Sequence, residues 1–302
     1  MMKILLTGAT GFVGNHIRKE IDIADNQIMF LIANGEEFIF RNSNSIAIKA
    51  DLKNLTKIKD KIKTFAPEAC IHCAWQGIPD YSEDVSKLNL FNSLALVDLL
   101  LKETSCKKLI IAGSCFEYGK TLGICKEHET GTPNQFFTWA KQSLYNYSDL
   151  MARNNNRTLI WFRMFYVYGA NQRIEALIPS LISSFQNNEK PKINKPFNAN
   201  DFIYMPDAAK AYRLALVKNV PSGIYNIGSG GSTRVIDICR LVEKKILGSS
   251  LITDQIEKEC DRTQDVNFHA DTSKTQKILG FKAERSLDEG ISHYITSLGN
   301  KK

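Results

Sequence analysis

The chain of 302 residues predicts an α/β fold in which a parallel sheet is covered by helices on both faces. Short strand-like runs alternate along its first half with helical patterns of about 10–15 residues, as they do in βαβ units. These runs are apolar throughout instead of alternating, which is typical of strands buried on both faces. A glycine-rich turn directly after the first run favours a doubly wound, Rossmann-type sheet.

The elements of the first half are each expected from a local pattern. Lys3–Thr7 (KILLT) is a buried strand, and an amphipathic helix follows the turn from about Val13 to Ile21. Further strands are expected at Ile28–Ile32, Ser45–Ala50, Ala69–Cys73, Lys108–Ala112 and Thr158–Met164. Long helices are expected over Leu88–Lys102 and Gln135–Arg153.

The second half of the chain is less regular. A polar stretch with two prolines, residues 187–201 (NNEKPKINKPFNAND), is expected to be a loop. Helical patterns follow at Ala208–Val217 and Val235–Ile246. The sequence shows no internal repeat and no low-complexity tail.

The composition is that of an ordinary globular protein, with 43% hydrophobic and 24% charged residues. The sequence has no run of about 18 apolar residues, so no membrane span is expected. The apolar run at the N-terminus is too short for a signal peptide. The seven cysteines are odd in number and scattered, which favours reduced thiols in the cytoplasm. Cys70 and Cys73 form a C-x-x-C without a second ligand pair, so a buried strand is expected there and no metal site.

The net charge of +7 does not indicate a nucleic-acid-binding surface. Five lysines crowd residues 53–63, but no arginine and aromatic residues are interleaved with them. Leu55, Ile58, Ile62 and Phe65 supply a buried stripe between the lysines, so a solvated helix face is expected. A mild positive excess suits an enzyme whose ligands are phosphorylated.

The turn Thr7–Gly14 (TGATGFVG) has the spacing G-x-x-G-x-x-G and predicts a phosphate-binding site. Glycine permits positive φ and lets a pyrophosphate approach the backbone closely. The N-terminus of the following helix offers unpaired N–H groups and a partial positive charge to that anion. The position of the turn, between a strand and a helix, makes it a strong sign of a dinucleotide site.

The end of the second strand leaves the type of dinucleotide open. NAD sites normally carry an acidic residue there, which binds the adenosine ribose. Here the sequence reads Ile32-Ala33-Asn34-Gly35-Glu36, with no carboxylate directly at the strand end and no arginine for NADP. Asn34 is the candidate contact, and the cofactor is NAD or NADP.

Several further motifs, spread over nearly the whole chain, resemble those of the extended short-chain dehydrogenase/reductases, the NAD-dependent epimerase/dehydratase family that acts on nucleotide sugars. The segments that carry the resemblance are Thr7–Gly14, Ala112–Gly119 (AGSCFEYG), Phe162–Gln172 (FRMFYVYGANQ), Asn200–Ala211 (NDFIYMPDAAKA), Gly223–Ile238 and Asp261–Phe281. Asn200 stands where the family usually has an arginine.

The resemblance implies two domains with a nucleoside-diphosphate sugar bound between them. Residues 1–168 would form the dinucleotide-binding Rossmann domain, and residues 169–302 a smaller, partly interleaved substrate domain. Residues from about 201 to 228 would return to the first sheet. The family also implies a homodimer, formed through a four-helix bundle that includes the two long helices. Leu94, Leu96, Leu99 and Leu100 make the first of these apolar on several sides, which fits such a bundle and fits simple burial equally.

The resemblance also assigns the site residues. The implied cofactor contacts are Gly8, Thr10, Gly11, Phe12, Val13, Gly14, Asn34, Asp51, Leu52, Cys73, Ala74, Trp75, Asn89, Lys141, Phe165 and Val167. The implied substrate contacts are Ser114, Cys115, Phe116, Tyr118, Gln172, Arg173, Asn200 and Arg262. No metal ligands are implied, and neither a nucleic acid nor a membrane is expected as a partner.

The catalytic group implied by the family is Ser114 with a Tyr-x-x-x-Lys pair on one helix face. Lys141 matches the lysine, but Phe137 stands at the tyrosine position and has no ionisable proton. Four explanations stay open. The phenylalanine is a replacement that slows an enzyme, natural or engineered; another group substitutes; water or a substrate hydroxyl relays the proton; or the protein binds its ligands without catalysis. The substitutes considered are Tyr145, Tyr118, Cys115 and Glu117.

The retained Ser114 and Lys141 favour an enzyme. The family's 4,6-dehydratases usually have acidic residues after the catalytic Ser or Thr, whereas this chain has Cys115 and Phe116. The segments Ser114–Gly119 (SCFEYG) and Cys73–Tyr81 (CAWQGIPDY), with the short chain, resemble the 4-ketoreductases of deoxysugar pathways. This resemblance implies NAD(P)-dependent reduction of a nucleoside-diphosphate 4-keto-6-deoxy sugar, as in surface-polysaccharide biosynthesis. The alternatives are 4-epimerisation and binding of the dinucleotide and sugar nucleotide without catalysis.

Overall fold

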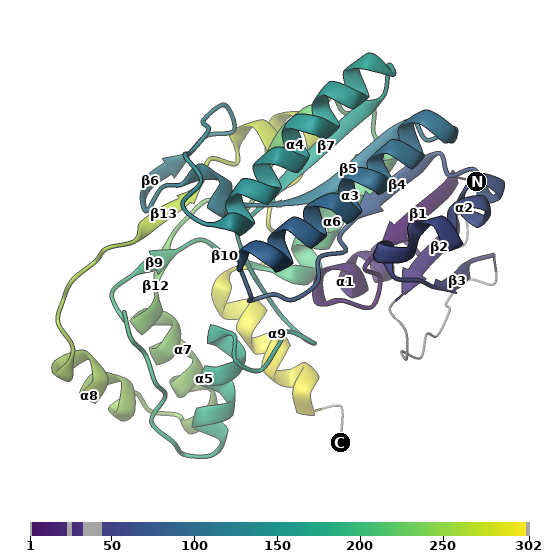
Figure 1. Cartoon of the computed structure of the whole chain (residues 1–302). Helices are drawn as coiled ribbons and strands as arrows, with labels where there is room; N and C mark the ends of the chain where they lie inside the picture. The colour runs from purple at the N-terminus through teal and green to yellow at the C-terminus, as the bar shows by residue number, and fades with distance from the viewer. Residues whose placement is uncertain (1, 23–25, 33–43, 300–302) are drawn as a thin grey trace.

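A seven-stranded parallel sheet forms the centre of the molecule (Figure 1). The structure is a computed structural model that describes residues 2–22, 26–32 and 44–299. The strands of this sheet lie in the order β11-β7-β5-β4-β1-β2-β3, and each neighbouring pair is parallel. The strands are β1 (Met2–Thr7), β2 (Asn26–Ile32), β3 (Ile46–Lys49), β4 (Ala69–His72), β5 (Lys108–Ser114), β7 (Thr158–Met164) and β11 (Gly223–Ile227). The predicted α/β class is confirmed.

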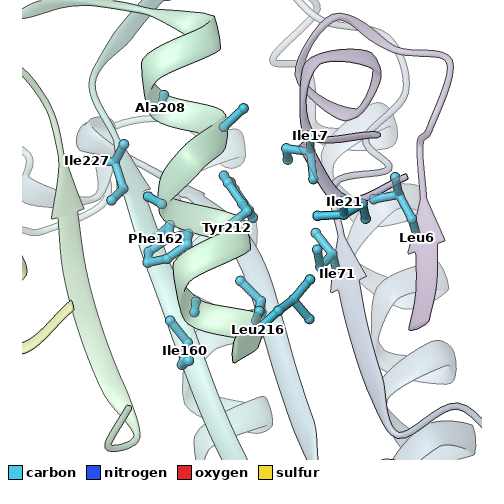
Figure 2. Close-up of a cluster of buried hydrophobic side chains, with 14 of the residues drawn as sticks. Leu6, Ile17, Ile21, Ile71, Ile160, Phe162, Ala208, Tyr212, Leu216 and Ile227 are labelled. Atoms are coloured by element: carbon cyan, nitrogen blue, oxygen red, sulfur yellow. The ribbon is translucent and has the colours of Figure 1, made fainter. Parts of the chain in front are cut away.

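Helices cover both faces of this sheet. On one face lie α1 (Phe12–Ile21) and α6 (Met205–Val217), and Figure 2 shows their side chains Ile17, Ile21 and Tyr212 against those of the strands. The helices on the other face are α2 (Lys59–Phe65), α3 (Glu83–Glu103) and α4 (Phe136–Asn154). Burial on both sides explains why the strands are apolar throughout.

The second half of the chain contributes to this sheet and also forms a separate packing layer. β11 pairs with β7, and α6 packs in the core cluster of α1. A four-stranded sheet has the order β12-β9-β13-β6, and a two-stranded sheet joins β8 to β10. The strands of these two sheets are β6 (Leu122–Cys125), β8 (Tyr166–Tyr168), β9 (Ala199–Asn200), β10 (Phe202–Tyr204), β12 (Thr233–Arg234) and β13 (Asn267–Ala270). The domain boundary at residue 168 stays a prediction.

A further apolar cluster packs the remaining helices of the second half against one another, and Figure 1 shows these helices in the lower part of the view. They are α5 (Leu177–Gln186), α7 (Val235–Leu247), α8 (Leu251–Glu259) and α9 (Leu287–Gly299). In the part of the chain that the structure describes, no helix is both long and apolar enough to cross a membrane.

Several expected boundaries are wrong. The first long helix begins at Glu83, five residues before the expected Leu88. The prediction missed its first turn because that turn is polar and lacks the apolar spacing of the rest of the helix. The lysine-rich stretch is a 3₁₀ turn, η1 (Leu52–Lys57), followed by α2, and not one helix. Asn54 inside η1 has a non-helical φ of −114° and ψ of 40°. The expected loop at 187–201 ends in strand β9.

Cys70 has the buried strand environment that the sequence predicts, whereas Cys73 follows the end of the strand and is half-buried. Cys70 is fully buried within β4, and all seven cysteines are free thiols. Among the described residues, no group of three or more His, Cys, Asp or Glu side chains could hold a metal ion.

Candidate active site

The glycine-rich turn joins β1 to α1 with a geometry that only glycine permits at two positions. Gly8 has a φ of +71°, and a Cβ there would lie 2.8 Å from the backbone nitrogen of Ala74. A Cβ on Gly14 would lie 2.0 Å from the carbonyl oxygen of Gly8, so the helix packs directly on the turn. Gly11 is the N-cap of α1 and has no capping side chain. The first N–H groups of the helix are therefore available to an anion.

A cavity of about 210 Å³ opens beside this turn, at the carboxyl ends of β1, β2 and β4. The strand order reverses between β1 and β4, and ligands of open α/β sheets bind at such a point. The predicted cofactor residues that line this cavity are Gly8, Thr10, Gly11, Leu52, Ala74, Trp75 and Asn89. Residues in the lining that the sequence did not single out are Leu31, Ile32, Ala50, Gln76, Asn92 and Ser93.

Other predicted cofactor residues lie near this cavity or outside the described chain. Phe12 and Gly14 belong to the first turns of α1 but are not in the lining. Asp51 accepts hydrogen bonds from the backbone N–H of Lys53 at 3.0 Å and the side-chain amide of Gln76 at 3.4 Å. Asn34 lies outside the described residues, so the choice between NAD and NADP stays open.

Asn89 holds the loop after β4 as well as lining the cavity. Its side chain accepts from the Gln76 backbone N–H at 2.8 Å, and donates to the carbonyl oxygens of Gln76 at 3.0 Å and Val85 at 2.8 Å. This asparagine therefore fixes the course of the segment that carries Trp75. The sequence pattern indicated a contact with the cofactor, but not this role in positioning the loop.

A buried histidine that sequence reasoning missed braces the same region. His72 lies between the hydroxyl oxygens of Thr7 (Nδ1, 2.7 Å) and Ser93 (Nε2, 2.9 Å). Burial, together with a smaller effect of the positive charge of Lys141, lowers its pKa to about 3. His72 is therefore neutral at physiological pH and links β1, β4 and α3 by hydrogen bonds.

A second cavity, of about 280 Å³, adjoins the first and shares Trp75 as a wall. The three predicted catalytic positions, Ser114, Phe137 and Lys141, all line it. The other predicted residues in its lining are Val13, Cys73, Trp75, Cys115, Phe116, Phe165, Val167 and Arg173. The sequence did not assign a role to Ile78, Tyr81, Ala112, Gly113, Met164 or Tyr166, which also line it.

Ser114 is held at the end of β5 by a capping box. Its backbone N–H donates to Glu117 Oε1 at 2.7 Å, and its hydroxyl oxygen accepts from the backbone N–H of Phe116 at 3.2 Å. The hydroxyl proton of Ser114 stays available to a ligand in the cavity. Gly113 is required next to it, because a Cβ there would lie 2.2 Å from Trp161 Nε1.

The carboxylate that anchors Ser114 is completely buried. Glu117 also accepts from Trp161 Nε1 at 2.9 Å and from Arg163 Nε at 3.1 Å. Burial raises the pKa of Glu117, and the guanidinium of Arg163 acts against that rise. Glu117 thus belongs to the framework of the site and does not line its cavity.

Lys141 extends from α4 to the floor of the cavity. Its ammonium donates to the carbonyl oxygen of Ala112 at 2.8 Å and lies 3.8 Å from the centroid of the Trp75 ring. Burial lowers the pKa of Lys141 to about 8, while Glu117 and Cys73 act in the opposite direction. The side chain is only 6% exposed, so its charge acts on whatever enters the cavity with little screening.

Phe137 lies one helical turn before Lys141, inside a group of aromatic rings. Its centroid is 4.9 Å from that of Tyr81, 5.5 Å from that of Trp75 and 6.2 Å from that of Phe116. The ring is 5% exposed. It fills the position of the missing phenol as an apolar surface.

Four predicted substrate residues do not line either cavity. The hydroxyl of Tyr118 donates to Asn226 Oδ1 at 2.6 Å in the core. Gln172 donates to the Val167 carbonyl oxygen at 2.9 Å, and Asn200 is buried in β9. Arg262 is exposed between α8 and β13. The role of these four residues in binding a substrate stays a prediction.

The two cavities together offer a phosphate cradle beside a small aromatic chamber that contains a hydroxyl and an ammonium. The buried indole N–H of Trp75, in the wall between them, has no hydrogen-bond partner among the described residues. An unpaired donor at this position suits a polar ligand that spans both cavities.

Comparisons with known proteins find chains that are similar to this one over nearly their whole length. The chain is 26% identical to dTDP-4-dehydro-6-deoxyglucose reductase of Escherichia coli, over 98% of this chain and 97% of that one. It is 26% identical to CDP-abequose synthase of Salmonella muenchen, over 97% of each. A solved structure of a mutant UDP-glucuronic acid 4-epimerase from Bacillus cereus, in complex with UDP-4-deoxy-4-fluoro-glucuronic acid and NAD, superposes with a TM-score of 0.82 at 21% identity, covering 100% of both chains.

The sequence model of the NAD dependent epimerase/dehydratase family matches residues 4–228, which include the glycine-rich turn, Ser114 and Lys141. The chain therefore belongs to the NAD dependent epimerase/dehydratase family.

Proposed function

We propose that this protein reduces the 4-keto group of a nucleoside-diphosphate 4-keto-6-deoxy sugar, with NADH or NADPH as the reductant, in the synthesis of surface-polysaccharide sugars. The observation that carries the proposal is the placement of Ser114 and Lys141 in one aromatic cavity that adjoins the glycine-rich turn. The E. coli relative is named for reduction of a dTDP-linked 4-keto-6-deoxy sugar, which supports this substrate class.

The residues of the first cavity fit a dinucleotide. The backbone at Gly8 and Gly14 has no room for a side chain, and α1 presents its free N–H groups to the space beside them. The unpaired indole N–H of Trp75 and the ammonium of Lys141 would meet the ribose end of the cofactor. The bound dinucleotide supplies the hydride for the reduction.

In the second cavity, the residues of the chain orient and polarise the substrate. Ser114 donates its hydroxyl proton in a hydrogen bond to the carbonyl oxygen of the sugar, where negative charge develops. Lys141 holds the ribose hydroxyls and adds a positive charge close to that oxygen. Phe137, Trp75 and Phe116 exclude water from the reacting carbon, which strengthens both interactions.

Two alternatives follow from particular observations. The fold neighbour from B. cereus is a nucleotide-sugar 4-epimerase, which supports 4-epimerisation as the second candidate reaction. The apolar ring of Phe137 at the proton-donor position supports a third candidate, a protein that binds the dinucleotide and the sugar nucleotide without turnover.

One set of measurements separates these functions. The protein is mixed with NADH or NADPH and with dTDP-, CDP-, UDP- and GDP-linked 4-keto-6-deoxy sugars. Cofactor oxidation that equals the amount of product formed is expected for the reductase. Interconversion of 4-hydroxy epimers without net oxidation would identify the epimerase. Tight binding of both ligands without any reaction would contradict both enzymes and identify the binding protein.

The setting of the reaction is part of the same proposal. We place the protein in the cytoplasm, because its seven free cysteines suit a reducing compartment. We also propose a homodimer in which α3 and α4 of two copies pack together. Phe91 is 62% exposed on α3, and Phe136, Trp139 and Leu150 are 45%, 36% and 50% exposed on α4.

A further inference from the structure

Three of the four groups that the sequence suggested as substitutes for the missing tyrosine are engaged elsewhere. The ring of Tyr145 packs on Trp161 with centroids 5.4 Å apart, and Tyr145 is absent from the lining of the cavity. The hydroxyl of Tyr118 is bonded to Asn226, and Glu117 accepts hydrogen bonds within the core. Cys115 lines the cavity, but burial raises the pKa of its thiol well above the ordinary value.

Another phenol occupies the space next to Phe137. Tyr81 precedes α3 in the loop after β4, and its ring is tilted by 44° against Phe137 at a centroid distance of 4.9 Å. It lines the same cavity as Ser114 and Lys141. Its hydroxyl makes no hydrogen bond with any residue in the described part of the chain, so it is available to a ligand.

The charges around Tyr81 suit proton donation. Burial raises the pKa of Tyr81, and the guanidinium of Arg173, which also lines the cavity, acts against that rise. Tyr166 also lines the cavity, but its pKa is raised by burial with no cation acting against it. The ring of Tyr166 packs instead against Phe116, Phe202 and Phe268.

We propose that Tyr81 acts as the proton donor that position 137 lacks. The role rests on the proposed reduction. As the substrate's carbonyl carbon accepts the hydride from the reduced dinucleotide, the π electron pair of the C=O bond moves to oxygen, and the oxygen takes the proton of the Tyr81 hydroxyl. The phenolate that forms is stabilised by Arg173 and takes up a proton from solvent afterwards.

The first test compares two tyrosine-to-phenylalanine variants. Tyr81→Phe is expected to lower kcat/KM for the 4-keto sugar by about 10²–10⁴-fold, the range for a lost general acid. The control is Tyr145→Phe, which removes a phenol from the helix of Lys141 without touching the cavity, and it is expected to retain the wild-type rate. A Tyr81→Phe protein that keeps the wild-type kcat/KM overturns the proposal, as does a large loss in Tyr166→Phe instead.

A second phenol separates proton donation from packing. Phe137→Tyr places a hydroxyl beside Ser114 and Lys141. The kcat/KM of the Tyr81→Phe/Phe137→Tyr double variant is therefore expected to be at least tenfold higher than that of Tyr81→Phe. The basic limb of its pH profile for kcat/KM is expected to move, because a different phenol then titrates. If Tyr81 only packs against Phe137, its loss lowers the rate equally in both backgrounds, and this result overturns the proposal.

Ligand binding provides a readout without turnover. For the ketone that the wild-type protein reduces, the probes are its 4-hydroxy product and the 4-deoxy analogue of that product. Tyr81→Phe is expected to weaken binding of the 4-hydroxy product about fivefold, the effect of one lost hydrogen bond, and to leave the Kd of the 4-deoxy analogue unchanged. Equal weakening for both probes overturns the proposal.

These outcomes distinguish the Tyr81 inference from the proposed function. A wild-type protein that reduces none of the 4-keto sugars contradicts the proposed function and the role of Tyr81 with it. A wild-type protein that is active, together with an equally active Tyr81→Phe variant, contradicts only the role of Tyr81.

Discussion

Lys141 carries its positive charge in surroundings that disfavour it. Burial lowers its pKa to about 8, whereas an unfolded chain leaves a lysine near its ordinary value of 10.5. Between these two pH values the unfolded state binds more protons than the folded state. The free energy of unfolding that is due to Lys141 therefore rises with pH across this window.

Lys141→Met makes this contribution measurable, because methionine has a similar length and no charge. The measured quantity is the melting temperature of the wild-type protein minus that of Lys141→Met. This difference is expected to rise from pH 8 to pH 10 and to stay level from pH 6 to pH 7. Subtracting the variant removes the titration of every group that does not interact with Lys141. A difference that is constant up to pH 10 would show that the folded-state pKa of Lys141 is not lowered.

Glu117 fixes Ser114 from inside the core, so its negative charge is expected to matter for stability. In Glu117→Gln the shape is retained, but Arg163 loses its charged partner at 3.1 Å. Breaking a buried pair in this way is expected to lower the free energy of unfolding by about 3 kcal/mol, measured by urea denaturation.

Glu103→Gln is the matched control, because Glu103 forms ion pairs with Lys59 and Lys63 at the surface. Exposed pairs of this kind contribute little, so its denaturation midpoint is expected to stay close to that of the wild-type protein. Equal losses in the two variants would contradict the structural role given to Glu117.

Two glycines in the turn between β1 and α1 are expected to differ in how well they tolerate a side chain. Gly14→Ala places a Cβ 2.0 Å from the carbonyl oxygen of Gly8, so α1 must move away from the turn. We expect dinucleotide affinity, measured by calorimetry, to fall at least tenfold and the melting temperature to fall as well. In Gly11→Ala the added Cβ has only a contact at 3.4 Å, so the fold is expected to be retained. Equal melting temperatures for the two variants would contradict this account.

Those parts of the molecule that depend on short stretches of chain were predictable. The strand, turn and helix over residues 2–21 follow from an apolar run and three glycines, which mark these elements within one short stretch of sequence, although β1 also pairs with the distant strand β4. Residues 83–87 were missed as helix since they lack apolar spacing, although Glu83 and Asp84 in a first turn do favour a helix start.

The proton donor proposed here depends on contacts between distant parts of the chain. The sequence identified Phe137 and Lys141, which are one helical turn apart, but it did not place Tyr81 against Phe137. That contact requires the loop after β4 to fold over α4, and the course of the loop is set by the hydrogen bonds of Asn89. Tyrosine in a loop with Gly77 and Pro79 has no local pattern that would reveal this position.

The surface of the whole molecule carries the argument for a dimer. α3 and α4 run side by side on one face of the sheet (Figure 1). Four large apolar side chains on these helices are exposed to solvent, namely Phe91, Phe136, Trp139 and Leu150. Large exposed side chains gathered on two adjacent helices are typical of an interface, whereas isolated ones are common on any surface. Two copies related by a twofold axis would bury both helix pairs in a four-helix bundle.

Phe91→Glu is the variant that tests this bundle, because Phe91 is 62% exposed and a charge at the centre of an apolar interface would remain unpaired. We expect the wild-type protein to sediment as a dimer at micromolar concentrations and Phe91→Glu as a monomer, with the secondary structure of both unchanged in circular dichroism. The control is Leu251→Glu, which changes a 76% exposed leucine on α8 and is expected to stay dimeric. A monomeric wild-type protein, or dissociation by both variants, would contradict the dimer through α3 and α4.

The dimer also bears on the cofactor site, because Lys141 lies on the inner face of α4. Loss of the bundle is expected to loosen the helix that holds this lysine. Dinucleotide binding is therefore expected to weaken in Phe91→Glu but not in Leu251→Glu.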